Sequence, residues 1–203
     1  KFVREDRKVL ISPMQLAAIA GLKESQNAMA TLTTFNEVNM SAAEDMRNTY
    51  AKAFEKKYGT QMSYLSLFLA AASAGIKEFP AVNHSIQGDH FIERSYQDIS
   101  VSVPTPYGLV NPIIRNAEKK SFTQFQSELD VYTKQARSGT LPLEALASGT
   151  FTILNGGACG ELFGTTLVSS PQACTLNLHM VKDRPMVIGK EVKVVPMMYV
   201  SLT

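Results

Sequence analysis

The chain has 203 residues, which is enough for one domain with a sizeable hydrophobic core. Hydrophobic residues make up 45% of it and charged residues 19%, as is ordinary for a globular chain. The formal net charge of +2 gives no reason to expect nucleic-acid binding, and no apolar run reaches the length of a membrane span. We therefore expect neither nucleic acid nor a membrane as a partner.

The cysteine content excludes two further classes of protein. Cys159 and Cys174 are the only cysteines, so the chain can build neither a disulfide framework nor a four-cysteine zinc site. Neither cysteine has a basic neighbour in sequence, which favours a packing role over a reactive thiol. Two unpaired cysteines are compatible with a reducing compartment.

The first part of the chain is predicted to be a linker followed by helices. Residues 1–13 carry mixed charge and end at a proline, so we expect a linker there and one domain over residues 14–203. Helical spacing predicts helices over residues 14–27, 41–58 and 63–79, and a β-rich composition predicts a strand over residues 31–39. Ser41 and Glu44 have the spacing of a capping box, and Gly59 is a stop signal.

The middle of the chain alternates short strands with one more helix. We expect strands over residues 82–86 and 91–94 around a Gly88-Asp89 turn, a half-buried alternating strand over 98–103, and a strand over 109–115. Ser121 and Gln124 form a second predicted capping box, at the start of a helix over residues 121–137.

The last part of the chain is predicted to be mostly strands, over residues 149–154, 173–180, 187–188 and 191–203, with a Gly189-Lys190 turn between the last two. This order of helices and mostly non-adjacent strands predicts an α+β fold. Its helices should lie on one face of a mixed sheet.

One stretch, GTFTILNGG at residues 149–157, has the pattern of a ligand-presenting turn. A short strand ends at Leu154, and Asn155, Gly156 and Gly157 then predict a tight turn in which positive φ costs little. Such a turn presents a side chain and bare backbone to a ligand. A phosphate-cradling loop is the alternative, but the stretch lacks the Lys-Ser/Thr pair of such loops.

The three histidines do not predict a metal site. His84 and His90 flank the expected hairpin, and no cysteine or further histidine is spaced to complete a zinc site with them. We interpret both as surface residues. His179 ends a predicted strand and is interpreted as a structural histidine whose hydrogen bonds are satisfied. No metal is expected.

An ordered series of motifs resembles one known family. The motifs run from about Ser12 to Thr203 and include LKESQNA, TTFNEVNMS, FEKKYG, KEFPAVN, DISVSVPTPYGLV, GTFTILNGG, DRPMVIG and VPMMYVSLT. Together they resemble the catalytic core of the dihydrolipoyl acyltransferases of 2-oxoacid dehydrogenase complexes, and most closely the succinyltransferases of the 2-oxoglutarate dehydrogenase complex.

The resemblance implies a mixed sheet flanked by helices, like that of chloramphenicol acetyltransferase, assembled as trimers that build a hollow cage. It implies active sites at subunit interfaces and transfer of a succinyl group from dihydrolipoamide to coenzyme A, with the lipoyl group on another domain. The implied partners are further copies of the chain, a 2-oxoacid decarboxylase and dihydrolipoamide dehydrogenase. The implied compartment is the mitochondrial matrix, or the cytoplasm of a bacterium.

The same resemblance identifies what the site needs and where this chain departs from it. The family's catalytic base lies in an Asp-His-Arg motif directly after the strand matched by residues 197–203, and thus beyond Thr203, in a C-terminal segment that this chain lacks. The family's oxyanion donor is a Thr or Ser at the position of Leu154, which has no donor. Thr152, Asn155, Gly156 and Gly157 remain candidates for binding substrate or coenzyme A. Either the chain is an acyltransferase core, or it is a catalytically silent scaffold that keeps only the assembly role.

Overall fold

The computed structural model describes residues 4–106, 108–147 and 149–203. Within these ranges, six strands form one mixed sheet in the order β1-β10-β9-β8-β4-β7. Their bounds are β1 Thr34–Asn39, β4 Ile99–Val101, β7 Ile113–Ile114, β8 Phe151–Asn155, β9 Thr175–Ile188 and β10 Glu191–Leu202. The pairs β4–β8 and β8–β9 are parallel and the others antiparallel, which confirms the predicted mixed sheet.

In the described residues, four α-helices accompany the sheet: α1 Pro13–Ala28, α2 Ser41–Tyr58, α3 Tyr64–Glu78 and α4 Phe122–Ser138. Helices α3 and α4 cover one sheet face, where side chains from both helices and from β4, β8, β9 and β10 form the hydrophobic core. Leu69 and Phe125, from the two helices, are at most 1% exposed, as is Ile153 at the centre of β8. The prediction of helices on one face of the sheet is therefore confirmed, and β8 is held firmly from that side.

The opposite face of the sheet is polar and also buried. The strand register places the following side chains on it, all under 9% exposed: Thr152, Thr175, Asn177, His179, Ser201 and Thr203. The segment between β8 and β9 covers them and bonds to several of them. Ser201 donates to the carbonyl oxygen of Gly164 (2.9 Å) and Thr166 donates to Thr203 (3.0 Å). Hydrogen bonds take the place of apolar packing on this side of the sheet.

Two predicted strands are divided in the structure. Residues 98–103 split into β4 and β5 Val103–Thr105, and residues 109–115 split into β6 Gly108–Val110 and β7. All three residues of β4 are buried: Ile99 and Val101 lie in the core on the helical side, and Ser100 is buried on the opposite face, so the predicted half-buried strand is wrong. Strands β5 and β6 form a separate two-stranded sheet. Pro112 separates β6 from β7, and its carbonyl accepts from the amide of Val101 (2.9 Å).

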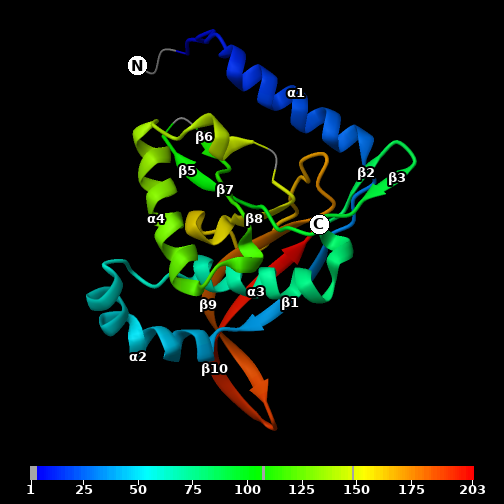
Figure 1. Cartoon of the computed structure of the whole chain (residues 1–203). Coiled ribbons are helices and arrows are strands. Elements are labelled where there is room, and N and C mark those ends of the chain that lie inside the picture. Colours follow the sequence, from blue (N-terminus) through cyan, green and yellow to red (C-terminus); the bar gives the residue numbers. More distant parts are fainter. Residues whose placement is uncertain (1–3, 107, 148) are drawn as a thin grey trace.

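Strand β9 is longer than the pattern suggests, because it continues through Pro185 as far as Ile188. Strand β8 pairs with β9 only as far as Leu178, so one edge of β9 is open at Pro185, where a missing N–H costs no ladder bond. The last turn of the hairpin is at Gly189, as predicted, with φ 68°. Figure 1 shows the β9–β10 hairpin extending out of the body of the fold.

The helix ends follow one capping prediction and contradict the other. At α4 both hydrogen bonds of the Ser121–Gln124 capping box are present. At α2 the N-cap is Met40, which makes no side-chain cap, so the Ser41–Glu44 box is wrong. Met40 is buried and its amide donates to the carbonyl of Pro196 (2.8 Å), which fixes the chain so that Ser41 is already helical.

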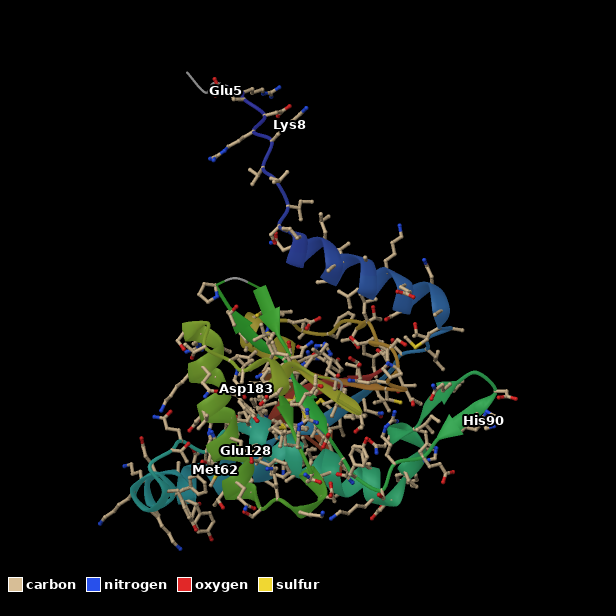
Figure 2. The ribbon with its side chains drawn as sticks, turned by 45° about the horizontal axis from the view of Figure 1, so that its top comes forward. Glu5, Lys8, Met62, His90, Glu128 and Asp183 are labelled. Atoms are coloured by element: carbon tan, nitrogen blue, oxygen red, sulfur yellow. The ribbon has the colours of Figure 1, made fainter. Side chains whose placement is uncertain are left out.

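Several elements at the periphery leave apolar side chains exposed. Helix α1 runs across one end of the molecule (Figure 1), and Leu16, Ile19 and Leu22 on it are 41–55% exposed. Residues 4–11 form no regular element, and Figure 2 shows Glu5 and Lys8 far from the body. The small β2–β3 hairpin (Ser85–Gln87, His90–Ile92) has its turn next to His90, which lies on the outside of the fold (Figure 2). Among the described residues, no helix combines the length and apolarity that a bilayer crossing requires.

Candidate functional site

The GTFTILNGG stretch forms β8 and the short turn after it, at the centre of the sheet. Strand β8 lies between β4 and β9, and Leu154 is opposite Asn177 on β9. Ile153 points to the helical side and packs in the hydrophobic core, so Thr152 and Leu154 point to the polar side. The strand therefore presents its last residues at the edge where the polar face meets the surface.

The turn after Asn155 differs from the prediction. Residues Gly156–Cys159 form a 3₁₀-helix, η4, and Asn155 caps it by accepting from the amide of Ala158 (3.3 Å). Gly156 and Gly157 do not have positive φ; the left-handed residue is Gly160, with φ 81°. The expected positive φ at Gly156 and Gly157 is therefore wrong.

The two glycines are required by close packing rather than by φ. A Cβ atom on Gly157 would lie 2.5 Å from the carbonyl oxygen of His179. A Cβ atom on Gly156 would overlap the carboxylate of Glu161. A side chain at Gly157 would push the turn away from β9, and one at Gly156 would displace the Glu161 carboxylate. The glycines thus let the backbone of the turn lie directly against the end of the strand.

Leu154 and Thr152 share a sheet face but have different surroundings. Leu154 is half-buried, and its side chain carries no hydrogen-bond donor. Thr152 is 6% exposed and donates to Oε1 of Gln172 (2.5 Å), while Nε2 of Gln172 donates to the carbonyl of Gly149 (3.1 Å). A ligand would reach the Thr152 hydroxyl only after displacing Gln172.

A cavity of about 470 Å³ borders the turn. Its walls come from the start of α3, the middle of α4, the turn and β9, and include Ser63, Asp130, Asn155, Gly157 and His179. A larger cavity of about 920 Å³ is lined by the end of β10, the start of β1 and the β2–β3 hairpin, with Thr203, Cys174, His84 and Phe91 among its residues. The turn and the end of β10 thus open onto different cavities.

His179 is buried, as a structural histidine should be, but only one of its nitrogens has a partner. Nε2 lies 3.1 Å from the hydroxyl of Ser201. Nδ1 is 3.6 Å from Oε2 of Glu161 and has no hydrogen-bond partner among the described residues. The expectation of a fully satisfied histidine is therefore only half right. Burial lowers the pKa of His179 below its ordinary value, against the weaker opposing effect of Glu161.

The remaining candidates are distributed over the surface. His90 is exposed and lies beside Asp89, and His84 is partly buried on the other side of the hairpin. Within the described parts of the chain, no group of three or more His, Cys, Asp and Glu side chains could hold a metal ion. Cys159 is exposed, whereas Cys174 is half-buried, and burial raises the pKa of the Cys174 thiol. This environment disfavours a thiolate at Cys174.

Two functional candidates were not apparent from the sequence. Asn177 and Glu161 contact the turn through their side chains, and neither belongs to a motif singled out above. The signal for Asn177 is the alternation along β9, where Thr175, Asn177 and His179 are polar and the residues between them apolar. No sequence signal identifies Glu161, because its role depends on two glycines folding around it.

Comparison with known proteins gives a consistent result. The chain matches the family model for the catalytic domain of 2-oxoacid dehydrogenase acyltransferases over residues 3–203. It is 46% identical over 202 residues to the mitochondrial dihydrolipoyllysine-residue succinyltransferase component of the 2-oxoglutarate dehydrogenase complex of Saccharomyces cerevisiae. That match covers 100% of this chain and 44% of the yeast protein, so the chain spans less than half of its relative.

The solved structures confirm the fold. The cubic core of the pyruvate dehydrogenase multienzyme complex superposes with a TM-score of 0.93 at 30% identity, covering 98% of this chain and 82% of that one. Chloramphenicol acetyltransferase superposes with a TM-score of 0.53 at 15% identity, over 89% of this chain and 84% of that one. The expected chloramphenicol-acetyltransferase-like α+β fold is thereby confirmed.

Proposed function

We propose that this chain, which belongs to the family of 2-oxoacid dehydrogenase acyltransferase catalytic domains, moves a succinyl group between dihydrolipoamide and coenzyme A. The observation that carries the proposal is the 46% identity to the yeast succinyltransferase component, which runs along the whole chain. Coenzyme A and the lipoyl group, carried by another domain, are the substrates. The proposed reaction uses no metal.

The chemistry assigns roles to the turn. Thioester transfer needs a base for the attacking thiol, a donor for the oxyanion of the tetrahedral intermediate, and exclusion of water. Asn155, Gly156 and Gly157 shape the surface beside Leu154, at the position that the family resemblance gives to the oxyanion donor. The base would follow Thr203.

The strand register favours an active site shared between two copies of the chain. Leu154 is opposite Asn177 and Asn177 is opposite Ser201, whereas Thr203 bonds to Thr175, two residues back toward the start of β8. A base following Thr203 would leave β10 at the amino end of β8, while Leu154 is near its carboxyl end. Two strand spacings of about 4.8 Å and two residues at about 3.3 Å separate Leu154 from Thr203 within one copy. We infer that the base reaches Leu154 from a neighbouring copy.

Exposed apolar side chains support self-assembly, which we propose as a trimer within a cage. Besides those on α1, the β9–β10 hairpin exposes Val187, Val192 and Val194 to 68–76%. Contact between copies would bury such residues. The further proposed partners are the 2-oxoacid decarboxylase and dihydrolipoamide dehydrogenase components. We propose the mitochondrial matrix, by analogy with the yeast relative, or a bacterial cytoplasm.

One observation favours a second candidate function, that of a catalytically silent scaffold. Leu154 replaces the hydroxyl that the proposed chemistry needs, and loss of one oxyanion donor typically lowers kcat by about 10²–10³-fold. The buried core and the packed turn do not depend on that hydroxyl. A chain of this kind would assemble without transferring acyl groups.

A single preparation distinguishes the two functions. The complete protein is assayed with succinyl-coenzyme A and dihydrolipoamide, with acetyl-coenzyme A as the comparison, and its assembly is measured by analytical ultracentrifugation. Preferential succinyl transfer by the assembled protein supports the enzyme and excludes the scaffold. Assembly with no transfer above the uncatalysed rate excludes the enzyme and supports the scaffold.

A further inference from the structure

Glu161 occupies an unusual position, folded back beneath the turn that it follows. Its carboxylate lies between Gly156 and Gly164, and a Cβ atom on either glycine would overlap a carboxylate oxygen. Glutamate is rarely enclosed in this way unless its oxygens have partners. The side chain is 36% exposed, so it keeps some contact with water.

The side chain of Glu161 is connected to the turn through Asn177. Nδ2 of Asn177 donates to Oε2 of Glu161 (3.2 Å), and Oδ1 of Asn177 accepts from the amide of Gly156 (3.3 Å). Asn177 is 2% exposed and lies opposite Leu154 in the sheet. One side-chain amide thus links the carboxylate to the first residue of the turn.

The backbone of Glu161 makes two more links. Its amide donates to the carbonyl of Gly156 (3.1 Å), and its carbonyl accepts from the amide of Met180 on β9 (2.9 Å). These bonds remain when only the side chain is changed. A substitution at Glu161 therefore isolates the contribution of the carboxylate.

His179 lies beside the carboxylate of Glu161 and connects it to Ser201. Its Nδ1 lies 3.6 Å from the same carboxylate oxygen, its Nε2 lies 3.1 Å from Ser201, and Ser201 donates to Gly164 (2.9 Å). The His179 side chain is fully buried. Asp130 of α4 is an acidic residue in the cavity that His179 lines. The unpaired Nδ1 faces the carboxylate across a gap slightly longer than a hydrogen bond.

We propose that Glu161 is a positioning residue for the acyl-transfer site, which it stabilises by fixing the turn at Leu154–Gly157 through Asn177 and against His179. Glu161 acts through Asn177 and does not itself contact the reacting atoms. The role of Glu161 in acyl transfer rests on the proposed function, whereas the mechanical coupling between its carboxylate and the turn is independent of that function.

The kinetic test compares three variants of the complete protein. Glu161→Ala removes the carboxylate, Glu161→Gln keeps its shape and one acceptor, and Glu78→Ala is a matched control, since that side chain is exposed at the end of α3. Loss of a charged hydrogen bond predicts that kcat falls about tenfold or more in Glu161→Ala. The KM for coenzyme A should stay within about twofold, because uniform substrate binding is retained. Glu161→Gln should recover most of kcat, and the control should not change.

Amide hydrogen exchange provides a readout that does not depend on activity. Exchange at Gly156 should accelerate about tenfold or more in Glu161→Ala and in Asn177→Ala, with Ile153 in the middle of β8 unchanged. Unchanged exchange at Gly156 in Glu161→Ala overturns the proposal. Faster exchange in a protein whose wild type transfers no acyl group leaves the coupling standing and refutes the proposed function instead. If Glu161→Ala does not fold, the shorter Glu161→Asp decides by the same measurement.

Discussion

Leu154 is the position at which the proposed chemistry can be tested most directly. Replacing it with threonine places a hydroxyl on the polar side of β8, at the position that the family resemblance gives to the oxyanion donor. If the rest of the site is intact, kcat should rise by about 10²–10³-fold, the factor typically lost when one such donor is removed. This corresponds to about 2.7–4 kcal/mol of transition-state stabilisation.

The same substitution should lower stability. Leu154 is half-buried, so exchanging its branched alkyl group for threonine removes only part of the roughly 0.8 kcal/mol that each buried methylene contributes. We expect the free energy of unfolding to fall by about 1 kcal/mol, or about 2–4 °C in Tm for a chain of this size. Activity and stability should therefore change in opposite directions.

The assay follows succinyl transfer by the complete protein, and the control variant is Leu154→Val. Valine has the shape of threonine without the hydroxyl, so it reproduces the packing change alone. Thermal unfolding establishes that both variants are folded. If folded Leu154→Thr is no faster than Leu154→Val, the argument that Leu154 stands in the donor's place is refuted.

Three further predictions concern stability. Gly157→Ala should reduce the free energy of unfolding by about 1–3 kcal/mol, because its Cβ would press on the carbonyl of His179; an unchanged midpoint in urea contradicts this. Acid should destabilise the fold, since burial lowers the pKa of His179 below its ordinary 6.5 and the folded state then binds fewer protons than the unfolded state. The contribution of neutral His179 to the free energy of unfolding is complete above about pH 6.5 and declines as the pH falls toward the lowered pKa. The variant His179→Gln should therefore show a weaker dependence of Tm on pH. Asp98→Ala should lower the free energy of unfolding by about 2–3 kcal/mol, because the buried carboxylate accepts from Arg115 (2.8 Å) and from the amide of Asn116 (2.9 Å); a loss below about 0.5 kcal/mol in chemical denaturation would show that neither bond matters.

Sequence reasoning was sufficient wherever a local rule decides the structure. The capping box at Ser121, the helix stop at Gly59 and the hairpin turn at Gly189 depend on residues close together in the chain, and all three lie where expected. The capping box at Ser41 failed because a tertiary contact, the burial of Met40 against β10, shifts the start of the helix. The half-buried prediction for β4 failed because burial of its second face depends on tertiary packing, which the alternation along one strand does not reveal.

The local structure around the proposed site was predictable only in part. The glycine-rich end of β8 was identified from composition, yet the reason for its glycines is a contact with His179 and Glu161 rather than their φ angles. A pattern of residue types predicts that small residues are needed, but not what presses against them. Asn177 and Glu161 lie 16 residues apart and meet only because the loop folds back over the polar face of the sheet.

The direction of the strands has a consequence for subunit cooperation. Because the two halves of the proposed site leave the sheet at opposite ends of β8, each functional centre would combine one half from each of two neighbours. Two inactive versions, one altered at the turn and one lacking the base, should then complement each other when they are co-assembled. Mixed particles would regain activity at those interfaces where an intact turn from one copy meets an intact base from its neighbour. The activity of a mixed population would therefore depend on the ratio of the two variants and not on either variant alone.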